Sequence, residues 1–295
     1  MPFWFRAFSG FSRRVKKGLF LPTAENPEQA LTFAFKFFEM RISIVQTSLI
    51  WENIEANLRN FSEKLAPLAG KTDLVVLPEM FTTGFTMNAT GLAEGMDGVT
   101  VRWMRETAAQ LGSAVAGSFI CREAGLNRNR LVFMFPDGHY EFYDKRHLFT
   151  LAGEHEVFSP GSRKLMLEWM GFRIRPMICY DLRFPVWSRN EASDAYDLML
   201  YVANWPSRRS QHWRSLLPAR AVENQSYLVG VNIVGRDGHD LEYSGDSCVI
   251  DYSGQQLASL SSCEAVVTVS VSLQELHDYR ARLPFLNDAD QFLIK

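Results

Sequence analysis

Cysteine is scarce in this chain of 295 residues, and its scarcity excludes two classes of protein. The four cysteines are widely separated, and no two of them form a C-x-x-C pair; they are Cys121, Cys179, Cys248 and Cys263. So sparse a set predicts neither a disulfide framework nor a structural zinc site. Proteins without structural disulfides are typical of reducing compartments, so we expect a cytoplasmic location and thiols that are free to react.

Long apolar runs and a strong net charge are also missing. No apolar stretch is long enough to cross a bilayer as a helix, so we expect no stable membrane association. A formal net charge of −2, with 47% apolar and 22% charged residues, is typical of an ordinary globular protein and gives no sign of a nucleic-acid partner. The length allows one large domain or two small ones with a sizeable core.

Residues 1–39 differ from the rest of the chain. Up to Ala24 they include no acidic residue, and their basic residues follow an aromatic start at 3–5, which is not the order of a secretory signal. A targeting segment, an amphipathic surface-binding arm and upstream sequence read from an early start codon all fit this composition. We favour the last, because Met40 directly precedes a well-patterned strand. The chain is therefore divided into an atypical extension, 1–39, and a domain, 40–295.

From Arg41 onward the hydrophobic pattern becomes regular and predicts strands interleaved with helices. Strands are expected at 41–46, 74–77, 114–120, 131–135, 140–143, 165–169, 172–178, 198–202, 227–234, 249–252, 256–260 and 265–271. Helices are expected at 51–68, 100–111 and 211–224, the last with Leu216, Leu217, Ala219, Ala221 and Val222 on its inner side. No linker interrupts the pattern. Two sheets packed face to face with helices outside accommodate this many strands in one α/β domain.

Reactive side chains follow three of these strands. The run 172–178 leads directly into Cys179, and a thiol at a strand-to-helix turn lies at the sheet edge, where backbone N–H groups are free to face a substrate. Glu79 follows the run 74–77 and Pro78, and a carboxylate partly removed from water there is a competent general base. Lys145 follows the run 140–143, where an ammonium group is able to stabilise an oxyanion.

Each of these residues has an ordinary explanation when it is taken alone. A lone cysteine after a strand is usually a buried structural residue. A loop glutamate such as Glu79 is usually solvated, and Lys145 stands beside Arg146 in what could be a surface basic cluster. Glu154 is a fourth candidate, able to orient Lys145 or to assist proton movement.

The combination, in this order along the chain, resembles the nitrilase superfamily of carbon–nitrogen hydrolases, whose Glu–Lys–Cys triad follows three strands. The likeness runs from about Met40 to the C-terminus, in blocks at 77–81, 143–149, 177–185, 202–206, 219–225 and 243–247. Two further blocks, at 78–85 and 284–290, are most similar to the omega-amidase group and its bacterial YafV-like branch.

The resemblance implies a four-layer α-β-β-α sandwich of two mixed sheets with outer helices. It makes Cys179 the nucleophile and Glu79 its general base, and it places Lys145 and the backbone N–H of Tyr180 in the oxyanion hole. Glu154 matches the additional glutamate of the family. No metal or organic cofactor is implied, and family members often self-associate, so we expect a homodimer.

The resemblance also implies a substrate. In omega-amidases an arginine four residues after the nucleophile holds the distal carboxylate, which here is Arg183. Guanidinium binds carboxylate bidentately, so amides of short dicarboxylates such as 2-oxoglutaramate are the expected substrates. The alternative for Arg183 is a structural ion pair with Asp181 or another acid. Aromatic residues expected at the pocket are Phe81, Phe85, Tyr180 and Trp205.

Three rival interpretations remain at this point. A Cys–His hydrolase would use one of His147, His155 and His212, none of which the sequence distinguishes from a loop histidine. Enzymes acting on other amides, nitriles or N-carbamoyl compounds share the same triad. A catalytically silent binding or scaffold protein is the alternative outside enzymes.

Overall fold

The computed structural model of the protein describes residues 39–292 and 294. The described residues all belong to one compact unit of the chain. The predicted extension 1–39 therefore lies outside the described residues except for Glu39, which begins the first strand, β1.

Six strands form the first sheet, in the order β14-β1-β2-β3-β4-β5. Their bounds are β1 (Glu39–Gln46), β2 (Leu74–Val76), β3 (Ala114–Glu123), β4 (Leu126–Met134), β5 (Tyr140–Asp144) and β14 (Ala265–Ser272). The three central strands β1, β2 and β3 are parallel to one another, and the other pairs are antiparallel, so the sheet is mixed.

The second sheet repeats this design with the order β13-β12-β9-β8-β7-β6. Its strands are β6 (Leu167–Trp169), β7 (Phe172–Ile178), β8 (Leu198–Val202), β9 (Tyr227–Val231), β12 (Cys248–Ile250) and β13 (Gln256–Ser259). Strands β7, β8 and β9 are parallel, with antiparallel strands on either side. A separate two-stranded ribbon pairs β10 (Val234–Arg236) with β11 (Glu242–Ser244).

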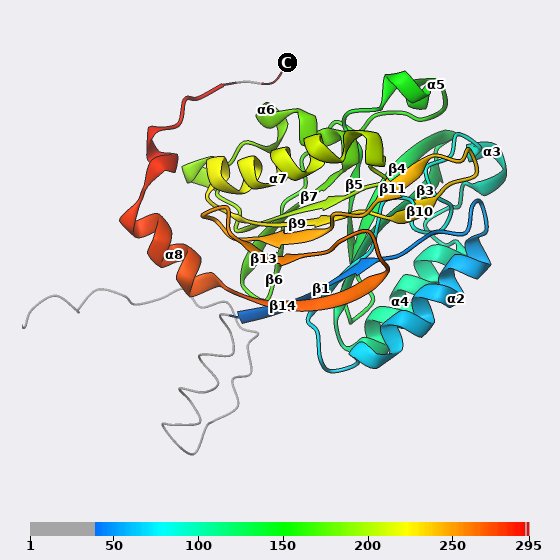
Figure 1. The fold of residues 1–295 in the computed structure, drawn as a ribbon, viewed down its shortest axis with the longest axis horizontal. Helices are drawn as coiled ribbons and strands as arrows, with labels where there is room; N and C mark the ends of the chain where they lie inside the picture. The colour runs from blue at the N-terminus through cyan, green and yellow to red at the C-terminus, as the bar shows by residue number, and fades with distance from the viewer. Residues whose placement is uncertain (1–38, 293, 295) are drawn as a thin grey trace, which may run out of the picture. The chain divides into compact units, whose positions relative to one another are not determined.

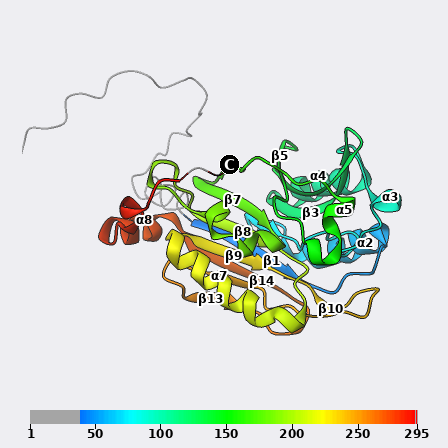
Figure 2. The same ribbon diagram turned by 90° about the horizontal axis from the view of Figure 1, so that it is seen from above.

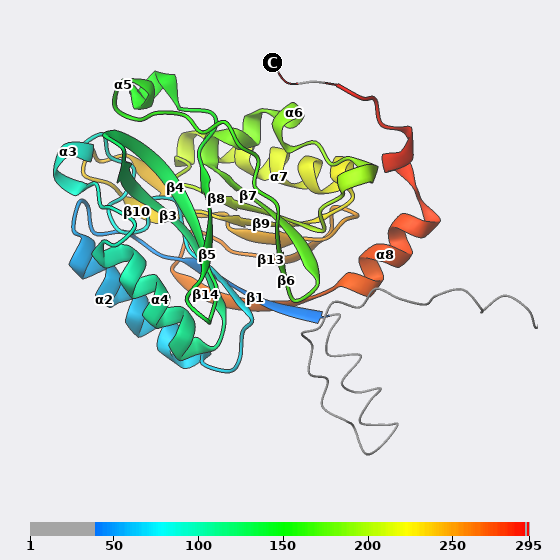
Figure 3. The same cartoon turned by 180° about the vertical axis from the view of Figure 1, so that it is seen from behind.

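Helices cover the outer face of each sheet, as the predicted four-layer sandwich requires. The pair α2 (Ile54–Leu65) and α4 (Val99–Leu111) packs on the first sheet and is seen side by side in Figure 1. The long helix α7 (Ser210–Asn224) covers the second sheet and lies outside β8 and β9 in Figure 2. The view from behind shows β3, β4 and β5 of the first sheet (Figure 3). The shorter helices are α3 (Ala89–Leu92), α5 (Glu154–Val157), α6 (Pro185–Ser188) and α8 (Leu273–Arg282).

Alternation along the strands of the first sheet explains how they are buried on both faces. In β2, Leu74 and Val76 point into the core between the two sheets, whereas Val75 points to the layer of α2 and α4. The neighbouring β4 alternates in the same way, with Phe133 between the sheets and Val132 under the helices. Because successive strand side chains point to opposite faces, a continuous apolar run is what such a doubly covered strand needs.

Several predicted boundaries are wrong, each for a local reason. The helix expected from 51 begins at Ile54, because the side chain of Asn53 accepts a hydrogen bond from the backbone N–H of Ala56 and caps it. The strand expected at 227–234 breaks after Val231, where Asn232 turns its side-chain amide to the carbonyls of Trp205 and Gly245, at 3.0 and 2.8 Å.

The inner face predicted for the helix at 211–224 is also partly wrong. Leu217 and Ala221 of α7 are buried, but Ala219 and Val222 are exposed, and Trp213 fills the core instead. Helix α8 and the ribbon of β10 and β11 were not predicted. No helix in the described part of the chain combines the length and the apolar composition needed to cross a membrane.

Candidate active site

Four polar side chains from the two sheets lie close together at the ends of their strands. Lys145 directly follows β5, and Glu79 stands three residues after the end of β2, both from the first sheet. Cys179 directly follows β7 and Asn204 follows β8, both from the second sheet. The site therefore lies where the two sheets meet, and neither sheet alone holds all of it.

Lys145 is the centre of a buried charge cluster. Its Nζ donates to Glu79 Oε1 at 2.9 Å and to Glu154 Oε1 and Oε2 at 3.0 and 2.9 Å. The side chain of Lys145 is 1% exposed, and those of Glu79 and Glu154 are fully buried. Burial of charge is costly without partners, so this ammonium and these two carboxylates depend on one another.

The electrostatics of the cluster keep Lys145 charged. Burial alone would lower the pKa of Lys145, but the negative charges of Glu154 and Glu79 outweigh burial and raise that pKa well above its ordinary value. Burial raises the pKa of Glu154, an effect that Lys145 opposes and the nearby Glu79 reinforces. Lys145 is therefore a permanent cation in the protein interior.

Two asparagines hold the Glu79 carboxylate in place. Asn129, in the middle of β4, donates from Nδ2 to Glu79 Oε1 at 2.8 Å. The backbone N–H of Asn204 donates to Glu79 Oε2 at 2.8 Å. With Lys145, each carboxylate oxygen has at least one donor, which fixes the orientation of the carboxylate before any substrate binds.

Cys179 occupies a strained turn. Its backbone φ is 44°, a left-handed conformation that is costly for a residue with a Cβ and that is often retained at functional sites. The turn continues as a 3₁₀ helix, Cys179–Arg183, in which Cys179 is half-buried. Burial, and then the negative charge of Glu79, raise the pKa of the Cys179 thiol, although Lys145 opposes them. The thiol is therefore protonated at neutral pH and needs a base to become a nucleophile.

A cavity of about 320 Å³ opens onto the thiol. Cys179 and Lys145 both line it, and Glu79, which is bonded to Lys145, is fully buried. Its volume suits a small molecule. The other lining residues are mostly aromatic, aliphatic or arginine side chains and include Phe85, Phe149, Tyr180, Arg183, Trp205, Arg209 and Tyr243.

Comparison with known proteins decides the family. A sequence profile of the carbon–nitrogen hydrolases matches residues 41–281. The chain belongs to the carbon–nitrogen hydrolase family. Enzymes of this family hydrolyse carbon–nitrogen bonds, and the two mixed sheets with outer helices agree with the solved structures of its nitrilase superfamily.

Individual relatives show which members of the family this chain is similar to. The chain is 45% identical to the omega-amidase YafV of Escherichia coli (strain K12) over 254 residues, which covers 86% of this chain and 98% of that protein. It is 33% identical to the 2-oxoglutaramate amidase of Bacillus subtilis (strain 168) over 250 residues, covering 84% of this chain and 96% of that one. The structure of XC1258 from Xanthomonas campestris, a CN-hydrolase superfamily protein with an arsenic adduct in its active site, superimposes with a TM-score of 0.85 at 46% identity, covering 87% of this chain and 99% of that chain.

In this carbon–nitrogen hydrolase the structure brings most of the predicted site residues together. Glu79, Lys145 and Glu154 are in direct contact, and Cys179 shares the cavity wall with Lys145. The four residues predicted to bind substrate, Phe85, Tyr180, Arg183 and Trp205, all line the same cavity.

Phe81 is a wrong prediction, because it does not reach the cavity. It is fully buried under the helix layer, where its ring packs 5.4 Å from Phe61 and 5.7 Å from Trp103. Among the candidate histidines, His155 is exposed on α5, and neither His147 nor His212 lines the cavity.

Asp181 was not assigned a role from the sequence, although it holds the site together. Its Oδ2 accepts from Tyr143 Oη at 2.7 Å and from the backbone N–H of Ile178 at 3.1 Å. Its Oδ1 accepts from the backbone N–H of His147 at 2.9 Å and lies 2.8 Å from His147 Nδ1. One buried carboxylate thus ties the turn that carries Cys179 to the segment that carries Lys145.

Replacing Asp181 with asparagine should therefore lower both stability and turnover. The amide would direct two N–H groups at donors that now bind a carboxylate, so we expect a loss of about 2–3 kcal/mol in the free energy of unfolding. Displacement of Cys179 relative to Lys145 should lower kcat by about tenfold or more. Urea denaturation and steady-state kinetics measure the two effects. Asp278→Asn, on the exposed face of α8, is the matched control and should change the unfolding free energy by less than about 0.5 kcal/mol. Equal behaviour of the two variants would refute the role of Asp181.

Proposed function

We propose that this carbon–nitrogen hydrolase is an omega-amidase, which hydrolyses the terminal amide of small dicarboxylate monoamides such as 2-oxoglutaramate. The observation that carries the proposal is one cavity lined by Cys179, Lys145 and Arg183, with the buried Glu79 carboxylate bonded to Lys145. The likeness to an omega-amidase and to a 2-oxoglutaramate amidase supports the same substrate class.

In the first half of the reaction Cys179 is the nucleophile. Its Sγ attacks the amide carbon as Glu79 removes the thiol proton, which forms a C–S bond and places negative charge on the amide oxygen. Glu79 then passes the proton to the amide nitrogen, the C–N bond breaks, and ammonia leaves. A thioester to Cys179 remains.

Two donors stabilise the oxyanion in this proposal, the ammonium of Lys145 and the backbone N–H of Tyr180. Lys145 suits the role because its charge is permanent and its position is fixed by Glu79 and Glu154. A pre-oriented cation costs little reorganisation when charge develops, which is the basis of oxyanion stabilisation in a site that excludes water.

In the second half a water molecule attacks the thioester carbon while Glu79 takes one of its protons. The C–S bond breaks, the sulfur regains the proton from Glu79, and the carboxylic acid leaves. Every proton is carried by Glu79, so the cycle calls for no metal or organic cofactor.

Arg183 is the proposed partner of the substrate carboxylate. Its guanidinium lies over the ring of Trp205, with 4.7 Å from Cζ to the ring centroid, and its Nη2 lies 3.1 Å from His212 Nδ1. No carboxylate of the described residues forms an ion pair with it, and Asp181 is fully engaged elsewhere. A guanidinium that lines the cavity without a carboxylate partner supports substrate binding better than the alternative of a structural ion pair.

A substrate panel tests the proposal through ammonia release. The panel contains 2-oxoglutaramate, glutaramate, amino-acid amides, nitriles and N-carbamoyl compounds. We expect kcat/KM for the first two to exceed that for the others by at least about 100-fold, because only they bring a carboxylate to Arg183.

Other outcomes of the panel point to the rival functions. A preference for nitriles or N-carbamoyl compounds would refute the omega-amidase assignment while leaving Cys179 as nucleophile. Absence of turnover on the whole panel, together with no alkylation of Cys179 by iodoacetamide, would favour a catalytically silent protein.

The proposed cellular setting is a homodimer in the cytoplasm, with the catalytic domain spanning 40–295. All four cysteines are free, as a reducing compartment favours. Sedimentation equilibrium of the full chain and of a chain starting at Met40 would test both the dimer and the domain boundary; a monomer would refute the first, and an unfolded short chain the second.

A further inference from the structure

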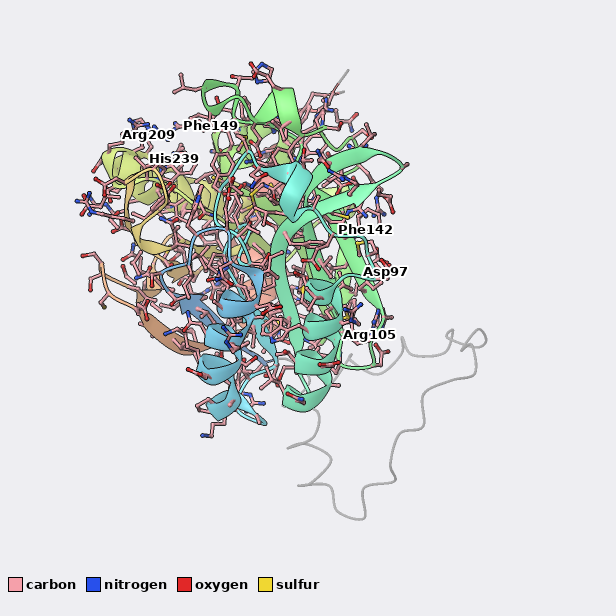
Figure 4. All side chains as sticks on the ribbon, turned by 90° about the vertical axis from the view of Figure 1, so that its right-hand side faces the viewer. Asp97, Arg105, Phe142, Phe149, Arg209 and His239 are labelled. Atoms are coloured by element: carbon pink, nitrogen blue, oxygen red, sulfur yellow. The ribbon has the colours of Figure 1, made fainter. Side chains whose placement is uncertain are left out.

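Arg209 lines the cavity, but the proposed reaction gives it no role. It ends the 3₁₀ turn Ser207–Arg209 and immediately precedes α7. Its guanidinium is half-buried, with Cζ 5.2 Å from the ring centroid of Phe149, and both residues line the cavity that contains Cys179. Figure 4 shows Arg209, Phe149 and His239 gathered at one end of the domain, away from Phe142 and Arg105.

The side chain of Arg209 has no hydrogen bond or ion pair with any described residue. Only its backbone is used, as its carbonyl oxygen accepts from Trp205 Nε1 at 2.8 Å. The buried Arg130, by contrast, contacts Asp144 at 2.7 Å and Glu123 at 2.8 Å. A guanidinium that is partly removed from water and has no protein partner would be stabilised by an anionic ligand.

The cavity offers Arg209 no protein anion. Among the residues that line it, the one carboxylate is Asp237, which is occupied within its own loop. Asp237 accepts from Tyr243 Oη at 2.9 Å and from the backbone N–H groups of His239 and Leu241 at 2.8 and 3.0 Å.

Positive charge accumulates around Arg209 instead. Burial, and then the charges of Arg208 and Arg183, lower the pKa of Arg209. The first turn of α7, which follows directly, contains no acidic residue, so the positive end of the helix dipole adds to the repulsion. A bound carboxylate would relieve all of these unfavourable contacts at once.

Arg183 and Arg209 belong to one aromatic wall. Arg183 lies over Trp205, whose Nε1 is bonded to the Arg209 carbonyl, and Arg209 lies over Phe149. The ring of Phe149 is in turn 4.9 Å from that of Tyr180, which directly follows the nucleophile. Contacts among cavity-lining residues thus connect both arginines to each other and to the residue that follows Cys179.

We propose that Arg209 is a specificity-determining residue that, with Arg183, forms a two-guanidinium clamp for the carboxylate at the substrate end remote from the scissile amide. The proposal deepens the omega-amidase function and rests on it for the identity of the reaction. It assigns the chain a strong preference for amides that carry a terminal carboxylate over neutral amides of the same length.

Kinetics with matched substrates test the clamp. We expect Arg209→Gln to raise KM for glutaramate by about tenfold to hundredfold with a small change in kcat, the loss typical of a charge-assisted contact. KM for pentanamide, a neutral amide with the same number of carbons, should stay within about twofold. Arg209→Lys should recover part of the loss. Arg214→Gln, an equal change of charge on the exposed face of α7, is the control and should match the unaltered enzyme. Equal losses on both substrates would show that Arg209 shapes the cavity and would overturn the clamp.

A second measurement needs no turnover. The alkylation rate of Cys179 is measured by mass spectrometry with the anion iodoacetate and with neutral iodoacetamide, and the ratio of the two rates reports attraction of an anion to the cavity. Arg209→Gln should lower this ratio by about fivefold or more relative to Arg214→Gln. An unchanged ratio with unchanged KM overturns the clamp and leaves the omega-amidase function intact. A lowered ratio in an enzyme that hydrolyses no carboxylate-bearing amide supports the anion site and overturns the proposed function.

Discussion

Replacing Glu79 with glutamine should abolish amide hydrolysis while leaving the protein folded. Glutamine keeps the shape, and its one oxygen can still accept from Asn129 and Lys145, although its NH2 group would then face the backbone N–H of Asn204. It cannot take a proton from Cys179. General-base catalysis is commonly worth about 10²–10⁴ in rate, and here one carboxylate serves both halves of the reaction, so we expect a loss of kcat near the upper end of that range. Ammonia release from glutaramate measures it.

Glu154→Gln is the matched control, because Glu154 is the second carboxylate bonded to Lys145. It changes the same charge in the same cluster, but Glu154 acts on the Cys179 thiol less strongly than Glu79 does, so its loss of kcat should be smaller by at least about tenfold. A Glu79→Gln/Cys179→Ala double variant should be no slower than either single variant, since residues that act as one unit are not additive. Substantial residual activity in Glu79→Gln would transfer the role of base to another group, with a histidine as the first candidate.

The same variant has an effect of opposite sign on the thiol. The negative charge of Glu79 is, after burial, the largest cause that raises the pKa of Cys179. Removing that charge should lower the thiol pKa, so the alkylation rate of Cys179 should rise at a lower pH in Glu79→Gln than in the unaltered enzyme. A variant that no longer hydrolyses amides, but whose Cys179 forms the thiolate at a lower pH, has lost the base and not the structure of the site. A midpoint shifted to higher pH would contradict the proposed electrostatics.

The sequence was sufficient for the parts of this site that follow from strand ends. Glu79, Lys145 and Cys179 each come after an apolar run, which places each of them at the end of a strand. The resemblance to the nitrilase superfamily then joined the three into one expected triad. The same logic predicted the two sheets, because runs that are apolar on both faces need cover on both sides.

Other parts of the site depend on contacts between distant segments and leave no local signal. Asn129 lies within a strand-like run, and only the fold shows that its amide points at Glu79, 50 residues away in the sequence. Asp181 reads as a surface acid beside Arg183, yet it is fully buried and binds the segment after β5. In the sequence, Arg209 is simply one of two basic residues before a helix. Only the packed structure shows that its side chain has no hydrogen-bond or ion-pair partner among the described residues.

Gly161 is a further case, in which a residue unremarked in the sequence fixes the position of Lys145. Its N–H donates to the Lys145 carbonyl at 2.8 Å, and a Cβ at this position would lie 2.2 Å from the Asp144 carbonyl oxygen. Only glycine allows the two segments to approach so closely. Lys145 is thus held from its backbone as well as from its side chain.

Removal of the Lys145 charge is expected to have the second of the two largest effects, on stability as well as on rate. In Lys145→Met the fully buried carboxylates of Glu79 and Glu154 would face each other without a cation, and breaking a buried ion pair from one side commonly costs about 3–5 kcal/mol of unfolding free energy. Loss of the oxyanion donor should lower kcat by a further factor of about 10²–10³. Urea denaturation and ammonia release measure the two losses separately.

The double variant Lys145→Met/Glu154→Gln distinguishes the two roles of the lysine. Neutralising Glu154 removes one of the two charges left unpaired, so the double variant should recover a large part of the lost stability. It should recover no activity, because the donor to the developing oxyanion is still missing and Glu79 is unchanged. If activity returned together with stability, Lys145 would act only by holding the fold, and the oxyanion role would pass to backbone N–H groups at the Cys179 turn. If neither returned, the cost of the single variant would arise from lost packing of the lysine stem and not from the two carboxylates.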